Sequence, residues 1–192
     1  WNDMNEPAVM DVPGKTFPND VRHDYDGNPC SHRKAHNVYG MQMARATYQG
    51  LKKFSYPKRP FVITRSAYSG TQRYTSSWTG DNLATWDHLT IANLQAQRMC
   101  MSGFSFIGSD IGGFAEQPNG ELYARWIQLG IFHPFCRTHS SGDHGDQEPW
   151  AFGTTITDVV RKFIEIRYQL LPYLYTAFWR YAEEGVPILK SL

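Results

Sequence analysis

Two aspartates stand in settings that suit acid–base and nucleophilic chemistry. Asp3 lies in Trp-Asn-Asp-Met-Asn-Glu-Pro at residues 1–7, and Asp81 lies in Trp-Thr-Gly-Asp-Asn at residues 78–82. Cleavage of a glycosidic bond needs two carboxyl groups, one to attack the anomeric carbon or activate water and one to protonate the leaving oxygen. From spacing alone, a helix cap or an ion pair is the commoner role of an aspartate, so both interpretations stay open.

A proton donor in such a pair must keep its proton near neutral pH. An apolar, partly desolvated setting favours the protonated carboxyl group. Trp78 and the backbone of Gly80 flank Asp81 in the sequence. We therefore expect them to provide that setting.

A cluster of metal-ligand residue types occurs in the second half of the chain, at His139, Asp143, His144 and Asp146. It lacks the paired spacing on one helix face that strong zinc motifs show, so we expect a sugar-contacting or solvated loop and no metal. The glycine-rich pieces do not match G-x-G-x-x-G between a strand and a helix, which argues against a nucleotide site.

The composition is that of an ordered globular protein. Of the 192 residues, 41% are hydrophobic and 19% are charged, and the formal net charge is +1. With no polybasic run and no apolar stretch near the roughly 20 residues that span a bilayer, we expect neither a nucleic-acid partner nor a membrane segment. Three scattered cysteines do not make a disulfide framework.

Strand, polar loop and helix recur along the chain. After a long loop over residues 1–30, the pattern predicts helices over 31–54, 86–101, 121–129 and 158–184, the last kinked near Pro172, with strands over 61–64, 103–108 and 131–136.

This alternation predicts an α/β fold with parallel strands, and the polar residues follow the strand ends as they do in a (β/α)₈ barrel. A full barrel takes roughly 250 residues, so we expect only part of one here. The chain opens on Trp1 rather than Met, and we expect both ends to be cut. The barrel fragment should cover residues 1–184, and residues 185–192 should start a following C-terminal segment.

Six segments, in order, resemble the family-31 glycoside hydrolases, the α-glucosidase family. Trp-x-Asp-Met-Asn-Glu resembles the family signature around the nucleophile, and Trp-Thr-Gly-Asp-Asn resembles the segment of the acid/base. The others are Phe-Val-Ile-Thr-Arg-Ser at 61–66, Gly-Ser-Asp-Ile-Gly-Gly-Phe at 108–114, Arg-Thr-His at 137–139 and the closing helix segment at 168–175.

The resemblance implies a (β/α)₈ barrel sampled from the end of its fourth strand through its eighth helix, with Asp3 as nucleophile and Asp81 as acid/base. It implies that Arg65 and Arg137 orient carboxylates or sugar hydroxyls, with a structural ion pair as the alternative for Arg137. The other substrate-binding residues that it implies are Trp1, Met4, Trp78, Asp110, Phe114 and His139, with Asn5 and Glu6 supporting the strand end. For Met4 and Phe114, packing in the core is the alternative.

The implied function is a retaining α-glucosidase that cleaves terminal α-linked glucose from oligosaccharides by double displacement, without a cofactor. Two alternatives remain open at this stage. One is an α-glucosyltransferase that uses the same residues, and the other is a catalytically incomplete carbohydrate-binding fragment. The expected partners are an α-glucoside oligosaccharide and the missing parts of the chain's own barrel.

Overall fold

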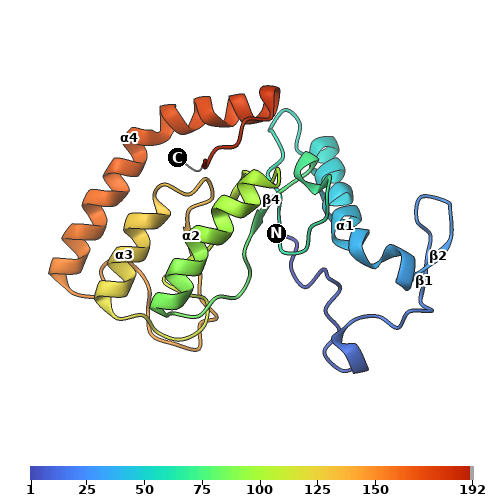
Figure 1. Ribbon diagram of the computed structural model, residues 1–192, viewed down its shortest axis with the longest axis horizontal. Helices are drawn as coiled ribbons and strands as arrows, with labels where there is room; N and C mark the ends of the chain where they lie inside the picture. The colour runs from blue at the N-terminus through green and yellow to red at the C-terminus, as the bar shows by residue number, and fades with distance from the viewer. Residues whose placement is uncertain (191–192) are drawn as a thin grey trace. The chain divides into compact units, whose positions relative to one another are not determined.

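The computed structural model describes residues 1–190. The chain forms two compact units, an N-terminal unit of Trp1–Ser77 and a C-terminal unit that begins at Trp78. In both units, helices alternate with short strands along the chain (Figure 1).

The N-terminal unit contains parallel strand pairing around β3 (Ile63–Thr64). Thr64 pairs with Asn2 on one side, and β3 pairs in parallel with the first two residues of β4 (Ser76–Trp78) on the other. The long helix α1 (His32–Phe54) precedes β3. A Cβ atom at Gly40 would lie 2.7 Å from the Ser66 carbonyl oxygen, so glycine lets α1 pack closely on the chain that follows β3. The helix predicted over 31–54 is confirmed.

Residues 1–31 hold more regular structure than the predicted loop. They contain the 3₁₀ turn η1 (Pro13–Lys15) and an antiparallel pair, β1 (Arg22–His23) and β2 (Cys30–Ser31). The turn between these strands includes Gly27, whose φ is 78° and whose N–H donates to Asp24 Oδ2 at 3.0 Å. Polar side chains that bond the backbone locally form such turns without an apolar period, which is why periodicity missed the hairpin.

The C-terminal unit contains α2 (Trp86–Met101), α3 (Gly120–Gly130) and α4 (Thr154–Glu184). The Thr85 hydroxyl caps α2 by accepting from an amide of its first turn, and the Asn119 side chain caps α3 in the same way. α4 is one helix with Pro172 inside it, and Figure 1 shows the helix changing direction part-way along. Proline removes an amide donor and crowds the preceding turn, as the predicted kink requires.

The strands of this unit are β5 (Ile107–Gly108), β6 (Asp110–Ile111) and β7 (Arg137–Thr138). β6 and β7 pair in parallel, and Thr79 N–H donates to the Gly108 carbonyl at 3.1 Å. The 3₁₀ turn η2 (Thr71–Arg73) and β4 lie where the sequence predicted only a loop.

The strand predicted over 131–136 is wrong. This segment has no ladder partner and runs as turns up to β7, which begins at Arg137 inside the predicted polar loop. The guanidinium group of Arg167 instead binds the carbonyl oxygens of Ile131, His133 and Pro134 at 2.7 to 3.0 Å. These bonds satisfy the carbonyl groups without a strand. The strand predicted over 103–108 is also shorter, because only its last two residues pair.

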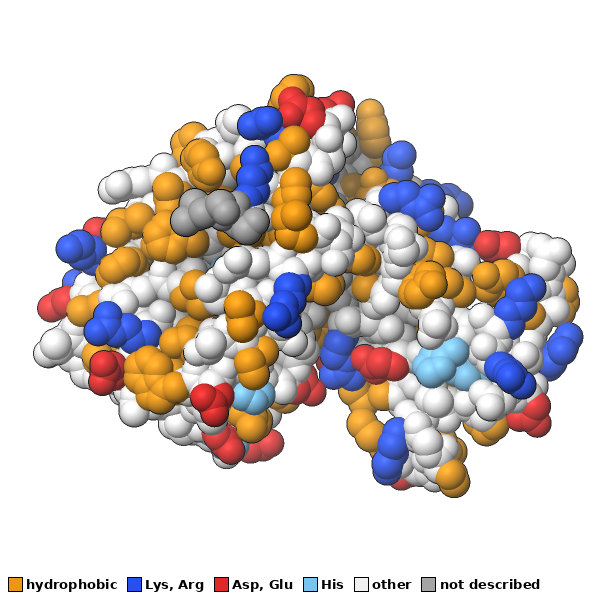
Figure 2. Space-filling model, in the orientation of Figure 1, with side chains coloured by type: hydrophobic (Ala, Val, Ile, Leu, Met, Phe, Trp, Pro, Cys, Tyr) orange, Lys and Arg blue, Asp and Glu red, His pale blue; other side chains and the backbone are white. Residues whose placement is uncertain are grey.

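At the surface, acidic and basic side chains are interspersed on the face drawn in Figure 2. Within residues 1–190, no helix has both the length and the hydropathy needed to cross a membrane. The same part of the chain holds no group of three or more His, Cys, Asp or Glu side chains placed to bind a metal ion. α4 ends at Glu184, and residues 191–192 of the predicted C-terminal segment lie outside the described residues.

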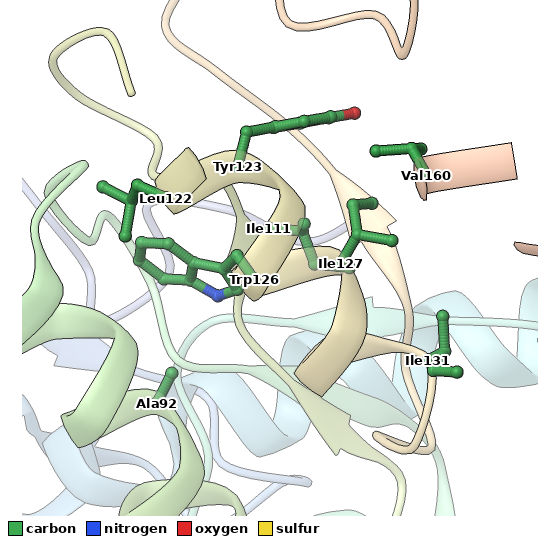
Figure 3. Packing of buried hydrophobic residues seen from close by; sticks show 8 residues of the cluster. All are labelled: Ala92, Ile111, Leu122, Tyr123, Trp126, Ile127, Ile131 and Val160. Carbon is green, nitrogen blue, oxygen red and sulfur yellow. The ribbon is translucent and has the colours of Figure 1, made fainter. Parts of the chain in front are cut away.

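The core of the C-terminal unit lies between α3, α4 and the β6 strand (Figure 3). Trp126 and Tyr123 are fully buried, and the indole N–H of Trp126 donates to Ser109 Oγ at 3.1 Å. Burying side chains of this size stabilises a fold by about 1.5 to 3 kcal/mol each. Ile111 of β6 belongs to this cluster, so the core fixes the strand that carries Asp110.

Candidate active site

Asp3 lies at a sharp turn directly after a bridged residue. Asn2 N–H donates to Ile63 O at 2.8 Å, and Asn2 O accepts from Arg65 N–H at 3.1 Å, so the chain pairs like a strand up to this point. Met4 then takes a left-handed conformation with φ of 57°, which is costly for a residue with a side chain. Its N–H donates to Asp3 Oδ1 at 2.8 Å. The turn thus orients the Asp3 carboxylate at a strand end.

Arg65 is a second polar contact of this carboxylate. Its Nε lies 3.1 Å from Asp3 Oδ1 and 2.8 Å from Glu6 Oε1. Its Nη2 contacts Glu6 Oε2 at 3.3 Å and Met4 Sδ at 2.8 Å. One guanidinium group therefore contacts two carboxylates of the same motif.

Asn5 joins the turn to the chain at β3 through its buried side chain. It is completely buried, and its Nδ2 donates to Thr64 Oγ1 at 2.8 Å while its Oδ1 accepts from Ser66 N–H at 3.1 Å. Trp1 and Met4, predicted as pocket walls, are 61% and 41% exposed. The N-terminal unit thus groups Asp3, Met4 and Arg65.

The C-terminal unit groups a second set of predicted residues around the β6–β7 pair. Asp110 and Arg137 are register partners, and Arg137 Nη2 donates to Asp110 Oδ1 at 2.7 Å. Asp110 is completely buried, so its charge is matched by a close guanidinium group. The Arg137 guanidinium also lies 5.6 Å from the ring centre of Trp78. For Arg137, the ion-pair alternative is therefore present in the structure.

The loops after β6 and β7 bring Phe114 and His139 together. Their ring centres lie 5.3 Å apart with an angle of 34° between planes. Gly113 precedes Phe114 with φ of 95°, and a Cβ atom there would lie 2.5 Å from Ala84 Cα. Only glycine fits this close approach, which fixes where Phe114 leaves the strand end.

Asp81 is exposed, and Trp78 is buried at 3% exposure. The apolar setting predicted for Asp81 is thus not formed by the described residues, because Asp81 is exposed although the neighbouring Trp78 is buried. The neighbouring Asn82 is tied down, since its Nδ2 donates to Asp110 O at 3.0 Å.

Sequence reasoning missed the side chains that fix the Asp81 loop. Asn82 and His88 both bond backbone groups of the strand-end loops. The signal that could have indicated His88 is its place three residues after the helix cap Thr85, where side chains reach back toward the preceding chain.

Burial shifts the pKa of two titratable groups that pack near these loops. It raises the pKa of the Tyr123 hydroxyl above its usual range, aided by the negative charge of Glu148. Burial also raises the pKa of the Cys136 thiol, which directly precedes β7. Both groups therefore stay neutral at physiological pH and serve packing.

Comparison with known proteins identifies the family to which this chain belongs. The family model described as the glycosyl hydrolases family 31 TIM-barrel domain matches residues 1–177. The chain belongs to glycosyl hydrolase family 31. The predicted fold class, part of a (β/α)₈ barrel, is confirmed.

Among curated relatives, the chain is 48% identical over 192 residues to Alpha-glucosidase 2 of Bacillus thermoamyloliquefaciens, covering all of this chain and 24% of that protein. Among solved structures, it matches a family 31 α-glucosidase from Bacteroides thetaiotaomicron with a TM-score of 0.88 and 40% identity, over 99% of this chain and 30% of that one.

A third match is an ER glucosidase II heterodimeric complex of a catalytic subunit and the binding domain of a regulatory subunit, with a TM-score of 0.94 and 41% identity over 99% of this chain and 21% of that one. The chain therefore spans about a fifth to a quarter of the length of the curated relatives that it matches.

Proposed function

We propose that the native protein carrying this chain is a retaining α-glucosidase that releases terminal α-linked glucose from oligosaccharides. Asp3 is the nucleophile and Asp81 the acid/base. The observation that carries the proposal is the Asp3 turn, where Arg65 and the Met4 amide both contact one carboxylate at a strand end of a family 31 barrel. The names of the relatives, which are α-glucosidases, support the substrate class.

The proposed reaction has two steps. In the first, an Asp3 carboxylate oxygen bonds to the anomeric carbon as the glycosidic C–O bond breaks, and Asp81 gives its proton to the leaving oxygen. In the second, Asp81 takes a proton from water, which attacks the anomeric carbon and releases Asp3. Two inversions return the α configuration.

The surrounding residues support these roles through orientation and charge. Arg65 contacts Oδ1 of Asp3, which leaves Oδ2 as the oxygen proposed to attack. We propose that Asp110, Arg137 and His139 bind sugar hydroxyls, with Trp1, Met4, Trp78 and Phe114 as apolar walls. A guanidinium contact fixes the orientation of the carboxylate before the substrate binds, which is typical of a pre-organised polar site.

Substitution with a stereochemical readout tests the proposal. We expect Asp3→Gly to abolish maltose hydrolysis. Azide should restore turnover of an activated α-glucoside by this variant and form β-glucosyl azide, because azide occupies the side that the carboxylate vacated. Asp81→Gly with azide should instead form the α product, because its glucosyl–enzyme ester still forms and azide opens it with a second inversion.

Asp11→Gly is a matched control from the same N-terminal loop, since Asp11 is exposed and lies outside the proposed site. We expect it to retain activity. If Asp3→Gly hydrolyses maltose at a near-normal rate, or if azide gives the same anomer with both variants, the assignment of the two carboxyl groups is wrong.

A further inference from the structure

Two histidines of the C-terminal unit accept hydrogen bonds from backbone amides at one small strand contact. His88 Nδ1 accepts from Leu83 N–H at 2.9 Å, and His144 Nε2 accepts from Glu116 N–H at 2.8 Å. Leu83 itself pairs in parallel with Ala115, the residue before Glu116. Each of the two paired segments thus has one imidazole acceptor.

These contacts define the state of both rings. A ring nitrogen accepts a hydrogen bond only when it carries no proton. In these contacts the accepting atoms, Nδ1 of His88 and Nε2 of His144, therefore carry no proton. The two rings act as fixed acceptors, which an amide oxygen of matching reach can imitate.

His88 reaches back from the start of α2. Its own N–H donates to the Thr85 hydroxyl at 3.2 Å, while its ring accepts from Leu83, two residues before the cap. This reciprocal pattern resembles a capping box, in which a side chain at this position satisfies an amide that precedes the helix. The ring therefore couples the start of α2 to the loop that follows Asp81.

His144 reaches over from the loop after β7. The amide that it binds belongs to Glu116, which has a left-handed φ of 67°. A residue with a side chain holds this conformation only where surrounding contacts enforce it. Further bonds join the same two loops, since Ser141 N–H donates to Phe114 O at 2.9 Å and Gln117 Nε2 donates to Asp146 O at 3.1 Å.

The segment held in this way fixes the neighbour of Asp81. Asn82 O accepts from the amides of Phe114 at 2.8 Å and Ala115 at 3.1 Å, and Ala84 N–H donates to Ala115 O at 2.9 Å. Any shift of residues 114–116 therefore moves the backbone at Asn82, directly after Asp81, and with it the Asp81 side chain.

We propose that His88 and His144 are positioning residues that hold the Asp81 turn in register with residues 114–116. This inference rests on the proposed role of Asp81 as acid/base. Neither histidine takes part in proton transfer. Each acts through a backbone amide, and losing either acceptor lets the turn move away from its working position.

Leucine and amide variants of the native protein test the proposal. His88→Leu and His144→Leu remove the acceptors. His88→Asn places an oxygen where Nδ1 lies, and His144→Gln places one where Nε2 lies, so these two serve as matched rescue variants. Amide hydrogen exchange at Leu83 and Glu116 reports the contacts directly, without any activity.

The position of the Asp81 carboxyl group is measured by how strongly the cleavage rate depends on the leaving group of the substrate. A displaced acid slows cleavage of maltose, which needs protonation, more than cleavage of α-glucosyl fluoride, which needs little. We expect each leucine variant to lower kcat/KM for maltose about tenfold and kcat/KM for the fluoride less than about threefold. The ratio kcat/KM is used because it reports formation of the glycosyl ester, whereas hydrolysis of the ester, in which Asp81 acts as the base, is common to both substrates. The asparagine and glutamine variants should recover most of the loss. A fold defect would lower both rates equally.

Two results would overturn the proposal: unchanged exchange at Leu83 and Glu116 in the leucine variants, or equal losses on both substrates without rescue. Failure of the proposed function is distinguishable, because the unsubstituted protein would then hydrolyse neither substrate while the exchange measurements still report the histidine contacts.

Discussion

His133 provides a sharp test of how burial controls charge in this fold. Its side chain is 2% exposed, and neither ring nitrogen has a hydrogen-bond partner in the described part of the chain. Burial, reinforced by the positive charge of Arg167, lowers the pKa of His133 from 6.5 to about 4. The folded protein therefore holds this ring neutral over a range in which the unfolded chain binds a proton.

The sign and size of the effect on stability follow by linkage. Because the folded pKa lies below the unfolded value, the unfolded state binds more protons between pH 6.5 and about 4, and the free energy of unfolding falls as the pH falls. The full difference is about 3 kcal/mol at 1.36 kcal/mol per pKa unit. About 2 kcal/mol of it should be lost between pH 7.5 and pH 5.

Urea unfolding of wild type and His133→Leu at pH 7.5 and pH 5 measures this contribution. Leucine carries no titratable group, so we expect its stability to fall by about 2 kcal/mol less than that of wild type over this interval. His133→Gln is a control that keeps polarity without the charge, and it should show the same reduced pH dependence. If all three proteins lose equal stability between these pH values, the ring is not held neutral by burial.

Three further predictions concern the β6–β7 region. Arg137→Met should lower the free energy of unfolding in urea by about 3 to 5 kcal/mol, because the buried Asp110 charge loses its guanidinium partner. Adding Asp110→Asn should restore part of the lost stability, and additive losses in the double variant would contradict the coupling of the two residues. Gly113→Ala should cost at least about 1 kcal/mol, because its φ is 95° and the new Cβ would meet Ala84 backbone atoms at 2.5 Å; an unchanged thermal midpoint would argue against that approach. Cys136 should react with a thiol reagent at pH 7.5 far more slowly than free cysteine, because burial raises the pKa of its thiol; rapid labelling of the folded protein would exclude this.

The helices were the most predictable part of the fold, because their signals are local. The apolar spacing between residues 31 and 54 and the run from 121 to 129 predicted α1 and α3 within a residue or two. β4 was missed because Ser76 and Ser77 are polar although both are buried. A strand of two or three residues depends on distant partners, which no local pattern records.

In the candidate site too, local motifs were predictable from the sequence, whereas contacts between distant residues were not. The motif around Asp3 led to the proposal that Asp3 is the nucleophile, whereas the contact of Arg65 with both Asp3 and Glu6 joins residues about 60 positions apart and could not be predicted. The pairing of Asp110 with Arg137 likewise depends on strand register. The expected apolar setting of Asp81 was wrong because the exposure of a loop residue depends on the tertiary packing around it, which its neighbours in the sequence do not record.

Trapping the covalent intermediate identifies the nucleophile. The native protein is incubated with 5-fluoro-α-glucosyl fluoride, which forms a glycosyl ester quickly and releases it slowly, and the adduct is located by peptide mass spectrometry. We predict one added fluoroglucosyl group on the peptide that carries Asp3, and none on Asp3→Asn. An adduct on another residue, or steady hydrolysis of α-glucosides to inverted glucose with no adduct, would contradict a retaining mechanism with Asp3 as nucleophile.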